Sequence, residues 1–518
     1  MALAFDNRFL AELPGDPDPT PRARQVLGAA YSRVAPTPVA APRLLAHSAE
    51  VAAAIGITRA QVEANDFAPV FAGNAQWPGM DPWASNYGGH QFGHWAGQLG
   101  DGRAISLGEV IGADGQRHEL QLKGAGRTPY SRHADGRAVL RSSLREFVCS
   151  EAMHALGVPT TRALSLIATG DDVVRDMFYN GNARAEPGAI ICRVAPSFIR
   201  FGHFELPASR QDFGLLEKWV DFTLARDYPQ LQGSVEQRRA AWFIEVCERT
   251  ARLIAQWMRV GFVHGVMNTD NLSILGLTID YGPYGWLEPF DPQWTPNTTD
   301  FEGRRYAYGR QPEIGQWNLS ALAGALVSLY PDQAPLQEGL KRYASVFGAE
   351  HARLTAARFG WPALGEYELQ LAQEFFALLR RDEVDMTLAF RHLADLDLGA
   401  PQIDTLAAAF YAPDRIAKGA TDWNAWLQAY ATRSLVDPRP ASERIAAMNS
   451  TNPLYVPRNY LAQLAIDAAE HGDVGLLQRW MDTLRRPYEE QPGREHFAAR
   501  RPEWARERAG CSMLSCSS

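Results

Sequence analysis

The chain has 518 residues, of which 46% are hydrophobic and 21% are charged. This length and balance predict a globular protein of roughly three domains, and the formal net charge of −8 argues against a general nucleic-acid binder. Five scattered cysteines exclude a disulfide scaffold, and neither a secretory signal nor a run of eighteen apolar residues is found. We therefore expect a cytoplasmic protein that binds neither nucleic acid nor membrane.

The N-terminal part of the chain changes composition twice. Residues 11–45 are proline-rich, and residues 46–66 are alanine-rich with a helical pattern. From Tyr87 the sequence reads YGGHQFGHWAGQLGDGRA, and so many glycines indicate close approach of the backbone to another group, or several turns with positive φ. His90 and His94 have the spacing of a helical metal pair, but the glycines weaken a helix, which favours structural histidines.

A hairpin and a helix follow the glycine-rich stretch. The alternating runs Arg103–Val110 and Arg117–Lys123 predict two strands around a short turn at residues 113–115. Between Ala138 and Leu156 apolar residues recur at helical spacing, with Glu146 beside the apolar stripe. Glycine-rich hairpin, strand lysine and helix glutamate in this order are typical of the nucleotide-binding half of a kinase-like fold. The alternative is an unrelated pair of surface charges.

Two arginines come next, Arg193 and Arg200, seven residues apart in IICRVAPSFIRFGHFE. Arginine in such apolar surroundings needs an anion, and its planar fork matches phosphate oxygens. The alternative is a pair of snorkelling or salt-bridged arginines. A long helix is then predicted from Gln237 to Val260, with Gly261 at its end.

The stretch after this helix, GFVHGVMNTDNLSILGLTIDYGP, contains the candidate metal ligands. Two β-branched runs that meet at Gly276 predict a tight hairpin with Asn271 and Asp280 at its open end. An amide oxygen and a carboxylate suit Mg²⁺, which takes its other ligands from phosphates and water. Phosphotransferases of the HGDxxxxN type carry a base directly after the His-Gly pair, where this chain has Val266. A carboxylate is present instead at Asp270, beside the asparagine.

The C-terminal half has the pattern of amphipathic helices, between about residues 316 and 395 and again between 400 and 485. Examples are Leu319–Leu329, Leu369–Leu379, Leu406–Tyr411 and Tyr460–Ala469. The charged run Arg494–Arg508 is typical of a solvated face. This half offers no chemical motif of its own.

Several long strings resemble the selenoprotein O (SelO) family, in its bacterial form with cysteine in place of selenocysteine, over nearly the full length. They are FDNRF at 5–9, NYGGHQFGHWAGQLGDGRA from 86, LQLKGAGRTPYSR from 120, HGVMNTDN from 264, IDYGP from 279 and a terminal CSS. The resemblance implies an α+β fold with a two-lobed, protein-kinase-like (pseudokinase) core. It also implies an enzyme that binds ATP flipped relative to kinases, transfers AMP to Ser, Thr or Tyr hydroxyls of proteins, and releases pyrophosphate.

The resemblance also assigns roles to individual residues. It implies Asp270 as the base that accepts the hydroxyl proton, and Asn271 and Asp280 as ligands of Mg²⁺ or Mn²⁺, with Asp280 also at the nucleotide. Glu146 takes the role of pairing with the lysine. The implied nucleotide contacts are Gly100, Gly102, Arg103, Lys123, Asp135, Gly136, Arg193 and Arg200. In this arrangement the two arginines hold the terminal phosphates while the α-phosphorus faces the acceptor hydroxyl.

Four regions follow from these assignments. We expect an N-terminal extension over 1–84, an N-lobe over 85–190, a C-lobe with the catalytic and metal loops over 191–330, and a helical region over 331–518. Some family members carry a cysteine after the metal aspartate that bridges to a C-terminal cysteine, but the loop PFDPQWTPNTTD has none. Cys511 and Cys516 are therefore either redox-active or unremarkable thiols of the tail.

Three other functions remain open on the sequence. Transfer of UMP from UTP needs only a different base pocket. Phosphotransfer is supported by the kinase-like order but opposed by Val266. A non-catalytic nucleotide-binding scaffold is opposed by the joint retention of Lys123, Asp270, Asn271 and Asp280, because a scaffold has no chemical need for all four.

Overall fold

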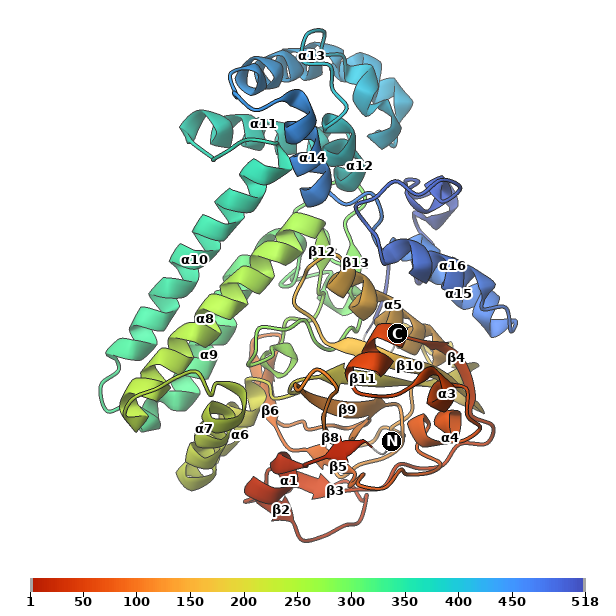
Figure 1. Ribbon diagram of the computed structural model, residues 1–518, viewed down its shortest axis with the longest axis vertical. Coiled ribbons are helices and arrows are strands. Elements are labelled where there is room, and N and C mark those ends of the chain that lie inside the picture. The colour runs from red at the N-terminus through yellow and green to blue at the C-terminus, as the bar shows by residue number, and fades with distance from the viewer. Residues whose placement is uncertain (1–2, 516–518) are drawn as a thin grey trace.

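The computed structural model describes residues 3–515 and combines a mixed sheet with many helices. The main sheet has nine strands in the order β2-β3-β5-β8-β9-β11-β10-β4, with β1 paired to β8 (Figure 1). Neighbouring strands are antiparallel except β2 and β3, which are parallel. The strands are β1 (Ala4–Phe5), β2 (Gly15–Asp16), β3 (Tyr31–Arg33), β4 (Arg43–His47), β5 (Trp83–Ser85), β8 (Ala104–Ile111), β9 (Arg117–Lys123), β10 (Arg162–Arg175) and β11 (Arg184–Ala195).

The predicted hairpin at the centre of this sheet is confirmed. Strands β8 and β9 pair in antiparallel register, with Ala104 opposite Lys123. Gly115 closes the turn at a φ of +73°, which glycine adopts without a steric penalty. The register places Lys123 at the end of β9, next to the neighbouring strand β11.

The helix predicted between Ala138 and Leu156 is α5 (Leu140–Ala155). It packs on β10 and β11, so its apolar stripe is buried against the sheet. Glu146 is buried with that stripe and reaches Lys123 at the end of β9. The sheet and this helix together therefore position the lysine and glutamate pair.

The composition of residues 46–66 suggested one helical segment, but the structure divides it. These residues end β4 and then form α2 (Ala49–Ala54) and α3 (Arg59–Val62), with α4 (Phe67–Phe71) following. Gly56 interrupts the helix at a φ of +86°, and Thr58 begins α3 with a reciprocal capping box. Capping signals at residues 56–58 thus override the alanine-rich composition.

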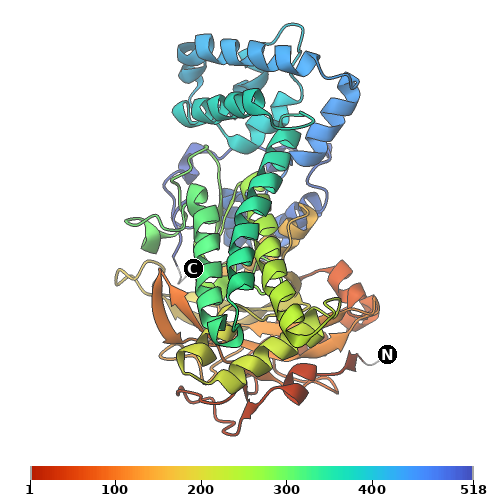
Figure 2. The same ribbon diagram turned by 90° about the vertical axis from the view of Figure 1, so that its left-hand side faces the viewer.

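Five long helices follow the main sheet: α6 (Gly202–Ser209), α7 (Phe213–Asp227), α8 (Val235–Val260), α9 (Gln311–Leu326) and α10 (Ala334–Arg358). The predicted helix ending at Val260 is confirmed as α8, which Ser234 caps at its start and Gly261 ends at a φ of +79°. Helices α8, α9 and α10 lie side by side and rise from the sheet (Figure 2). The loop between α8 and α9 holds the candidate metal ligands.

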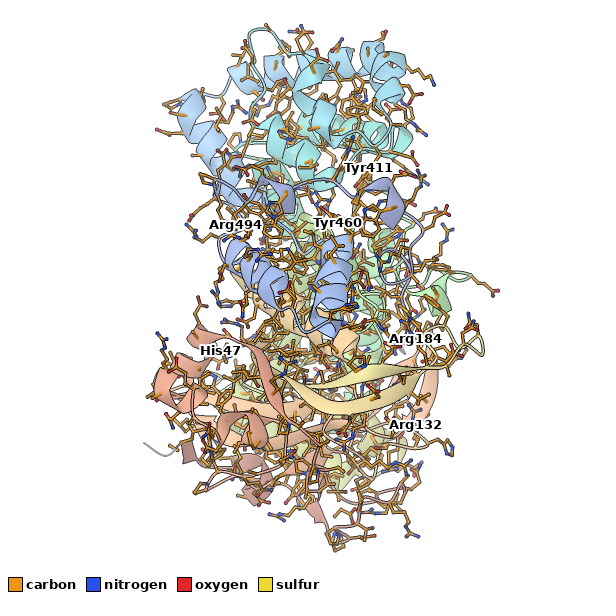
Figure 3. All side chains as sticks on the ribbon, turned by 90° about the vertical axis from the view of Figure 1, so that its right-hand side faces the viewer. His47, Arg132, Arg184, Tyr411, Tyr460 and Arg494 are labelled. Atoms are coloured by element: carbon orange, nitrogen blue, oxygen red, sulfur yellow. The ribbon has the colours of Figure 1, made fainter. Side chains whose placement is uncertain are left out.

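The C-terminal helices form two groups. One is the upper group in Figure 1, α11 (Glu366–Arg381), α12 (Met386–Leu393), α13 (Pro413–Leu435) and α14 (Ala441–Thr451). The other, α15 (Asn459–Glu470) and α16 (Gly475–Leu484), returns to pack on α5. Figure 3 shows this second group, with Tyr460 labelled, between the sheet and the upper helices. The second group thus supports α5 from the side opposite the sheet.

Most of the predicted C-terminal helices are present, with one difference in type. The segments predicted at 319–329, 369–379 and 460–469 lie within α9 and its 3₁₀ extension, α11 and α15. Of the segment Leu406–Tyr411, residues 406–409 instead belong to a 3₁₀ helix, Ile403–Ala409. The charged run 494–508 contains two short 3₁₀ turns. Within residues 3–515, no helix combines the length and apolar character that a membrane span needs.

Candidate active site

A cleft of about 480 Å³ lies between the glycine-rich segment 87–104, with neighbouring parts of the main sheet, and the loop that follows α8. Both sides contribute charged side chains to its lining. The sequence-predicted residues that line it are Gly100, Gly102, Arg103, Lys123, Arg193, Arg200, Asp270, Asn271 and Asp280. Residues from five separate parts of the chain therefore meet in one cavity of a size suited to a small-molecule ligand.

The glycines of the cleft allow two backbone segments to approach each other. Gly100 has a φ of +69°, and a Cβ there would overlap the ring of Tyr130. A Cβ at Gly102 would lie 3.0 Å from the Tyr130 carbonyl oxygen. Thr128 secures the same approach by donating from its hydroxyl to the Asp101 carbonyl, at 2.6 Å. Side chains at these two positions would push the wall of the cleft outward.

Lys123 and Glu146 form an ion pair at the floor of the cleft. The Nζ atom of Lys123 lies 2.6 Å from Glu146 Oε2 and 3.6 Å from Asp280 Oδ1. Burial lowers the pKa of Lys123, and the two carboxylates oppose that shift. Glu146 does not line the cleft itself but holds the lysine from behind, in the pairing role that the sequence predicted.

Arg193 on β11 and Arg200 just after that strand converge on Asp280. Nη1 of Arg193 lies 2.6 Å from Asp280 Oδ1 and 3.1 Å from Glu146, and Nη1 of Arg200 donates to Asp280 Oδ2. Both arginines are almost fully buried, with exposed fractions of 2% and 1%. They are salt-bridged, as one sequence interpretation held, and they also line the cleft.

Asp280 is the carboxylate at the centre of this cluster. Burial opposes its ionisation, but Arg200, Arg193 and Lys123 outweigh burial and hold the pKa of Asp280 well below its usual range. Its backbone has a φ of +55°, which is rare for a residue other than glycine and costs on the order of 1–3 kcal/mol. The cluster of cations thus keeps a strained aspartate ionised inside the cleft.

Asp270 has a different environment, on the 3₁₀ helix η1 (Thr269–Asn271). Burial raises the pKa of Asp270 to about 7, with Arg200 and Gln91 opposing the shift. Its Oδ2 accepts a hydrogen bond of 3.2 Å from Gln91 Nε2. Its Oδ1 is buried and has no hydrogen-bond partner among the described residues. Two carboxylates of one cleft are therefore held in opposite protonation regimes, which is typical of catalytic sites.

The predicted hairpin between Asn271 and Asp280 is wrong. The two runs share only an isolated bridge, Leu272 with Thr278, around a turn at Gly276 with a φ of +69°. Their backbones pair instead with distant segments, in isolated bridges of Ser273 with Arg200 and of Thr278 with Thr160. Asn271 and Asp280 nevertheless both line the cleft, as the hairpin hypothesis required.

Asp135 and Gly136 lie outside the lining of the cleft. Asp135 forms an ion pair with Arg175 at 2.7 Å and accepts the Arg137 backbone N–H. Gly136 has a φ of +73° and sits so close to the Gly126 carbonyl that no Cβ would fit. Both residues shape the 126–137 loop, whose residues 130–132 and 134 do reach the cleft.

Three residues in or beside the cleft, Tyr87, Gln91 and Gln121, carried no assignment from the sequence. Arg200 stacks over Tyr87, at 4.8 Å from the ring centroid, and the Tyr87 hydroxyl donates to Asp101. Gln121 accepts from Arg193, and its position two residues before Lys123 put it on the lysine's face of the strand. Gln91 gave no such signal, because the glycines around it indicated only close approach. Tyr87 and Gln121 thus contact the two arginines, whereas Gln91 contacts Asp270.

Comparison with known proteins settles the family. Residues 18–485 match the model of the family described as "Protein adenylyltransferase SelO". The chain belongs to the SelO family. Proteins named "Protein nucleotidyltransferase YdiU" from Aromatoleum aromaticum and Xanthomonas axonopodis pv. citri are each 63% identical to it, and one from Azoarcus sp. is 61% identical. Each match covers 100% of this chain and 99% of the relative.

Membership confirms the resemblance inferred from the long strings and makes this SelO-family chain a protein nucleotidyltransferase. The assignment agrees with a cleft that combines buried arginines, a lysine and two carboxylates. The roles of individual residues stay predictions, since the family match concerns the chain as a whole.

The donor set at the cleft fits a divalent cation that also binds phosphate. Among residues 3–515, no group of three His, Cys, Asp or Glu side chains forms a protein-only metal cluster. Asn271 donates from Nδ2 to the Val266 carbonyl at 2.9 Å, which leaves its Oδ1 as a ligand atom. Asp280 supplies the carboxylate. Two protein oxygens are what Mg²⁺ usually takes at a nucleotide site.

Two histidines and four cysteines of this SelO-family chain are candidates for metal or redox roles by residue type, and none of them lines the cleft. His90 and His94 lie on the two strands of a hairpin, β6 (Gly88–Gln91) and β7 (His94–Gln98), rather than on a helix. His90 is opposite Trp95 there and pairs with Glu205 at 2.6 Å. Cys149, Cys192 and Cys247 are buried and free. Cys511 is also buried, and burial raises its pKa to about 11. Cys516 lies outside the described residues.

Proposed function

We propose that this chain transfers AMP from ATP to Ser, Thr or Tyr hydroxyls of proteins and releases pyrophosphate, using a two-lobed, kinase-like core. The observation that carries the proposal is the convergence of two buried arginines on Asp280, in the same cleft as a second carboxylate of raised pKa. A phosphotransferase would need its base at Val266, which has none.

The arginines would hold the terminal phosphates. Arg193 and Arg200 are buried, and their forks now bond to carboxylate oxygens, whose geometry phosphate oxygens share. With Lys123 the two arginines make three cations, which face the two carboxylates Asp280 and Glu146. The cluster therefore carries a net positive charge, which attracts a polyphosphate. If the arginines bind the β- and γ-phosphates, the α-phosphorus lies nearer the opening of the cleft.

Asp270 would act as the general base. Its pKa of about 7 lets the carboxylate accept a proton near neutral pH, where a base is most effective. The acceptor oxygen attacks the α-phosphorus, its proton passes to Asp270, and the bond to the bridging oxygen breaks. The electron pair leaves with pyrophosphate, whose charge the arginines already hold.

The metal would be Mg²⁺ or Mn²⁺, held by Asn271 and Asp280. When bound, it supplies positive charge that offsets the charge developing on the transferred phosphate. The chain prepares both ligands: the Asn271 amide is oriented by the Val266 carbonyl, and three cations keep Asp280 ionised. When Arg193 and Arg200 bond to the phosphates instead of to Asp280, the oxygens of Asp280 would become free to bind the cation.

The test uses ATP labelled at the α- or at the γ-phosphate, with Mg²⁺ or Mn²⁺ and a protein acceptor. We expect α-label on protein and γ-label only in pyrophosphate. Label from the γ-position on protein would instead establish phosphotransfer, and no transfer of either label would establish a scaffold. Parallel α-labelled UTP covers UMP transfer, because the relatives' name "nucleotidyltransferase" specifies no base. Asp270→Asn should abolish transfer and retain nucleotide binding.

A further inference from the structure

The β6–β7 hairpin lies directly against the loop that carries Asp270. The backbone N–H of His90 donates to Thr269 Oγ1 at 2.7 Å, and that of Phe92 donates to Asn268 Oδ1 at 3.1 Å. Between these two bonds, the side chain of Gln91 reaches Asp270. Three consecutive residues of the hairpin thus hold three consecutive residues of the catalytic loop.

The glycines of the hairpin make this approach possible. A Cβ on Gly89 would lie 2.9 Å from both Cβ and Oδ1 of Asp270, closer than side chains pack. On the other side, a Cβ on Gly202 at the start of α6 would overlap the Gly88 carbonyl. The hairpin is therefore wedged between α6 and Asp270, and the group that its glycines approach is the catalytic loop.

This wedge leaves the two carboxylate oxygens of Asp270 unequal. Oδ1 is buried beside Gly89 and receives no hydrogen bond from any described residue. Oδ2 accepts from Gln91 Nε2, and because Oδ1 is buried, Oδ2 is the oxygen left for an acceptor in the cleft that Asp270 lines. The terminal torsion of a carboxylate has broad wells, and Gln91 is the described side chain that donates to this one, so its bond sets the direction of Oδ2.

We propose that Gln91 is a positioning residue, which fixes Oδ2 of Asp270 toward the acceptor hydroxyl by donating from its amide. The inference rests on the proposed function, because it needs Asp270 to act as the base. One lone pair of Oδ2 accepts from Gln91, and the other is left for the proton of the acceptor. The hairpin thereby serves the acceptor side of the reaction, whereas Lys123, Arg193 and Arg200 serve the nucleotide side.

The test compares Gln91→Ala and Gln91→Glu with the wild-type chain. Transfer of α-label from ATP is measured on the chain itself and on casein, a hydroxyl-rich acceptor protein, at pH 8. For Gln91→Ala we expect kcat to fall about 10-fold with the KM for ATP unchanged, since a misdirected base costs rate and not nucleotide binding. Gln91→Glu keeps the shape but has no N–H to donate, so its kcat should fall at least as far.

Gln98→Ala is the matched control on the same hairpin. Gln98 bonds to the backbone of Val26 and Arg24 at 2.8 Å each, away from the cleft, so its loss should lower the melting temperature and leave kcat near the wild-type value. A Gln91→Glu variant as active as the wild type would show that only the shape of Gln91 matters and would overturn the inference. So would a rise in KM for ATP with kcat unchanged. Absence of α-label transfer by the wild type would overturn the proposed function and this inference with it.

Discussion

The two sides of the cleft are built in different ways. On the sheet side, Lys123 ends a seven-residue strand and Glu146 lies within a sixteen-residue helix, and the two meet at 2.6 Å. On the loop side, Asp270 and Asn271 belong to a three-residue 3₁₀ helix, and Asp280 has a left-handed backbone. Regular elements position the first pair, whereas contacts from distant segments position the second group.

This difference indicates where the structure can tolerate change. A strand and a helix are each stabilised by many backbone hydrogen bonds, so one lost contact moves their side chains little. The loop is held by single bonds from distant segments, among them β6–β7, Tyr306 and Asn318, and the bond between Gln91 and Asp270 joins residues 179 positions apart. We therefore expect small substitutions beside the loop to cost more activity than their size suggests.

The largest effect is expected at Asp280, where the two sides meet. Asp280→Asn removes the charge that Arg193, Arg200 and Lys123 face, and with it the proposed metal carboxylate. We expect transfer to fall by about 10³-fold, together with loss of metal-dependent nucleotide binding, measured by α-label incorporation and calorimetry. Asp404→Asn, at an exposed aspartate, is the control. Retention of metal-dependent binding by Asp280→Asn would remove Asp280 from the ligand set.

A smaller loss is expected from one added methyl group on the loop side. In Gly89→Ala the new Cβ would lie 2.9 Å from the Asp270 side chain, which must then move. We expect kcat to fall by about 10²-fold while nucleotide affinity stays close to the wild-type value. Gly324→Ala, which meets no atom within 4 Å in α9, is the matched control. Equal kcat in both variants would show that the loop adjusts freely and that the two sides of the cleft tolerate change alike.

The same difference explains what the sequence could predict. The strand ending at Lys123 and the helix containing Glu146 follow from period-2 and helical patterns, and the turn at residue 115 follows from its glycine. The hairpin at Gly276 was wrong because the partners of that stretch, Arg200 and Thr160, are distant in the sequence and leave no local pattern. The glycines from residue 88 predicted close approach correctly but could not name the Asp270 loop as the neighbour.

Burial of polar residues was also beyond the sequence. The alternation in β9 placed Gln121 and Lys123 on one face, and a solvated strand end was an acceptable interpretation of that pattern. In the structure Glu119, Gln121 and Lys123 are all buried, because groups from outside the strand cover this face: Arg193 reaches Gln121, and Glu146 of α5 reaches Lys123. Burial of this face depends on tertiary contacts, which the sequence of one strand does not predict.

The smallest effect is a pH-dependent change in stability at Glu119, on the sheet side. Burial, followed by the neighbouring Glu109, raises the pKa of Glu119 to about 7, above the ordinary value of 4.5. A carboxyl whose pKa is higher in the folded state binds protons more tightly there, so the wild type loses stability as pH rises from 4.5 to 7. Above pH 7 the free energy of unfolding has fallen by its full amount, roughly 3 kcal/mol.

Glu119→Gln carries no titrating group and should escape this loss. Relative to the wild type, its melting temperature should rise by about 3 °C between pH 5 and pH 8, which is the shift that roughly 3 kcal/mol gives a chain of this length. Glu503→Gln, at an exposed side chain, should show no such trend. If Glu119→Gln and the wild type keep a constant difference at both pH values, Glu119 titrates alike in the folded and unfolded chain. The sheet side would then hold its buried carboxylate without cost, and its greater tolerance would rest on backbone bonding alone.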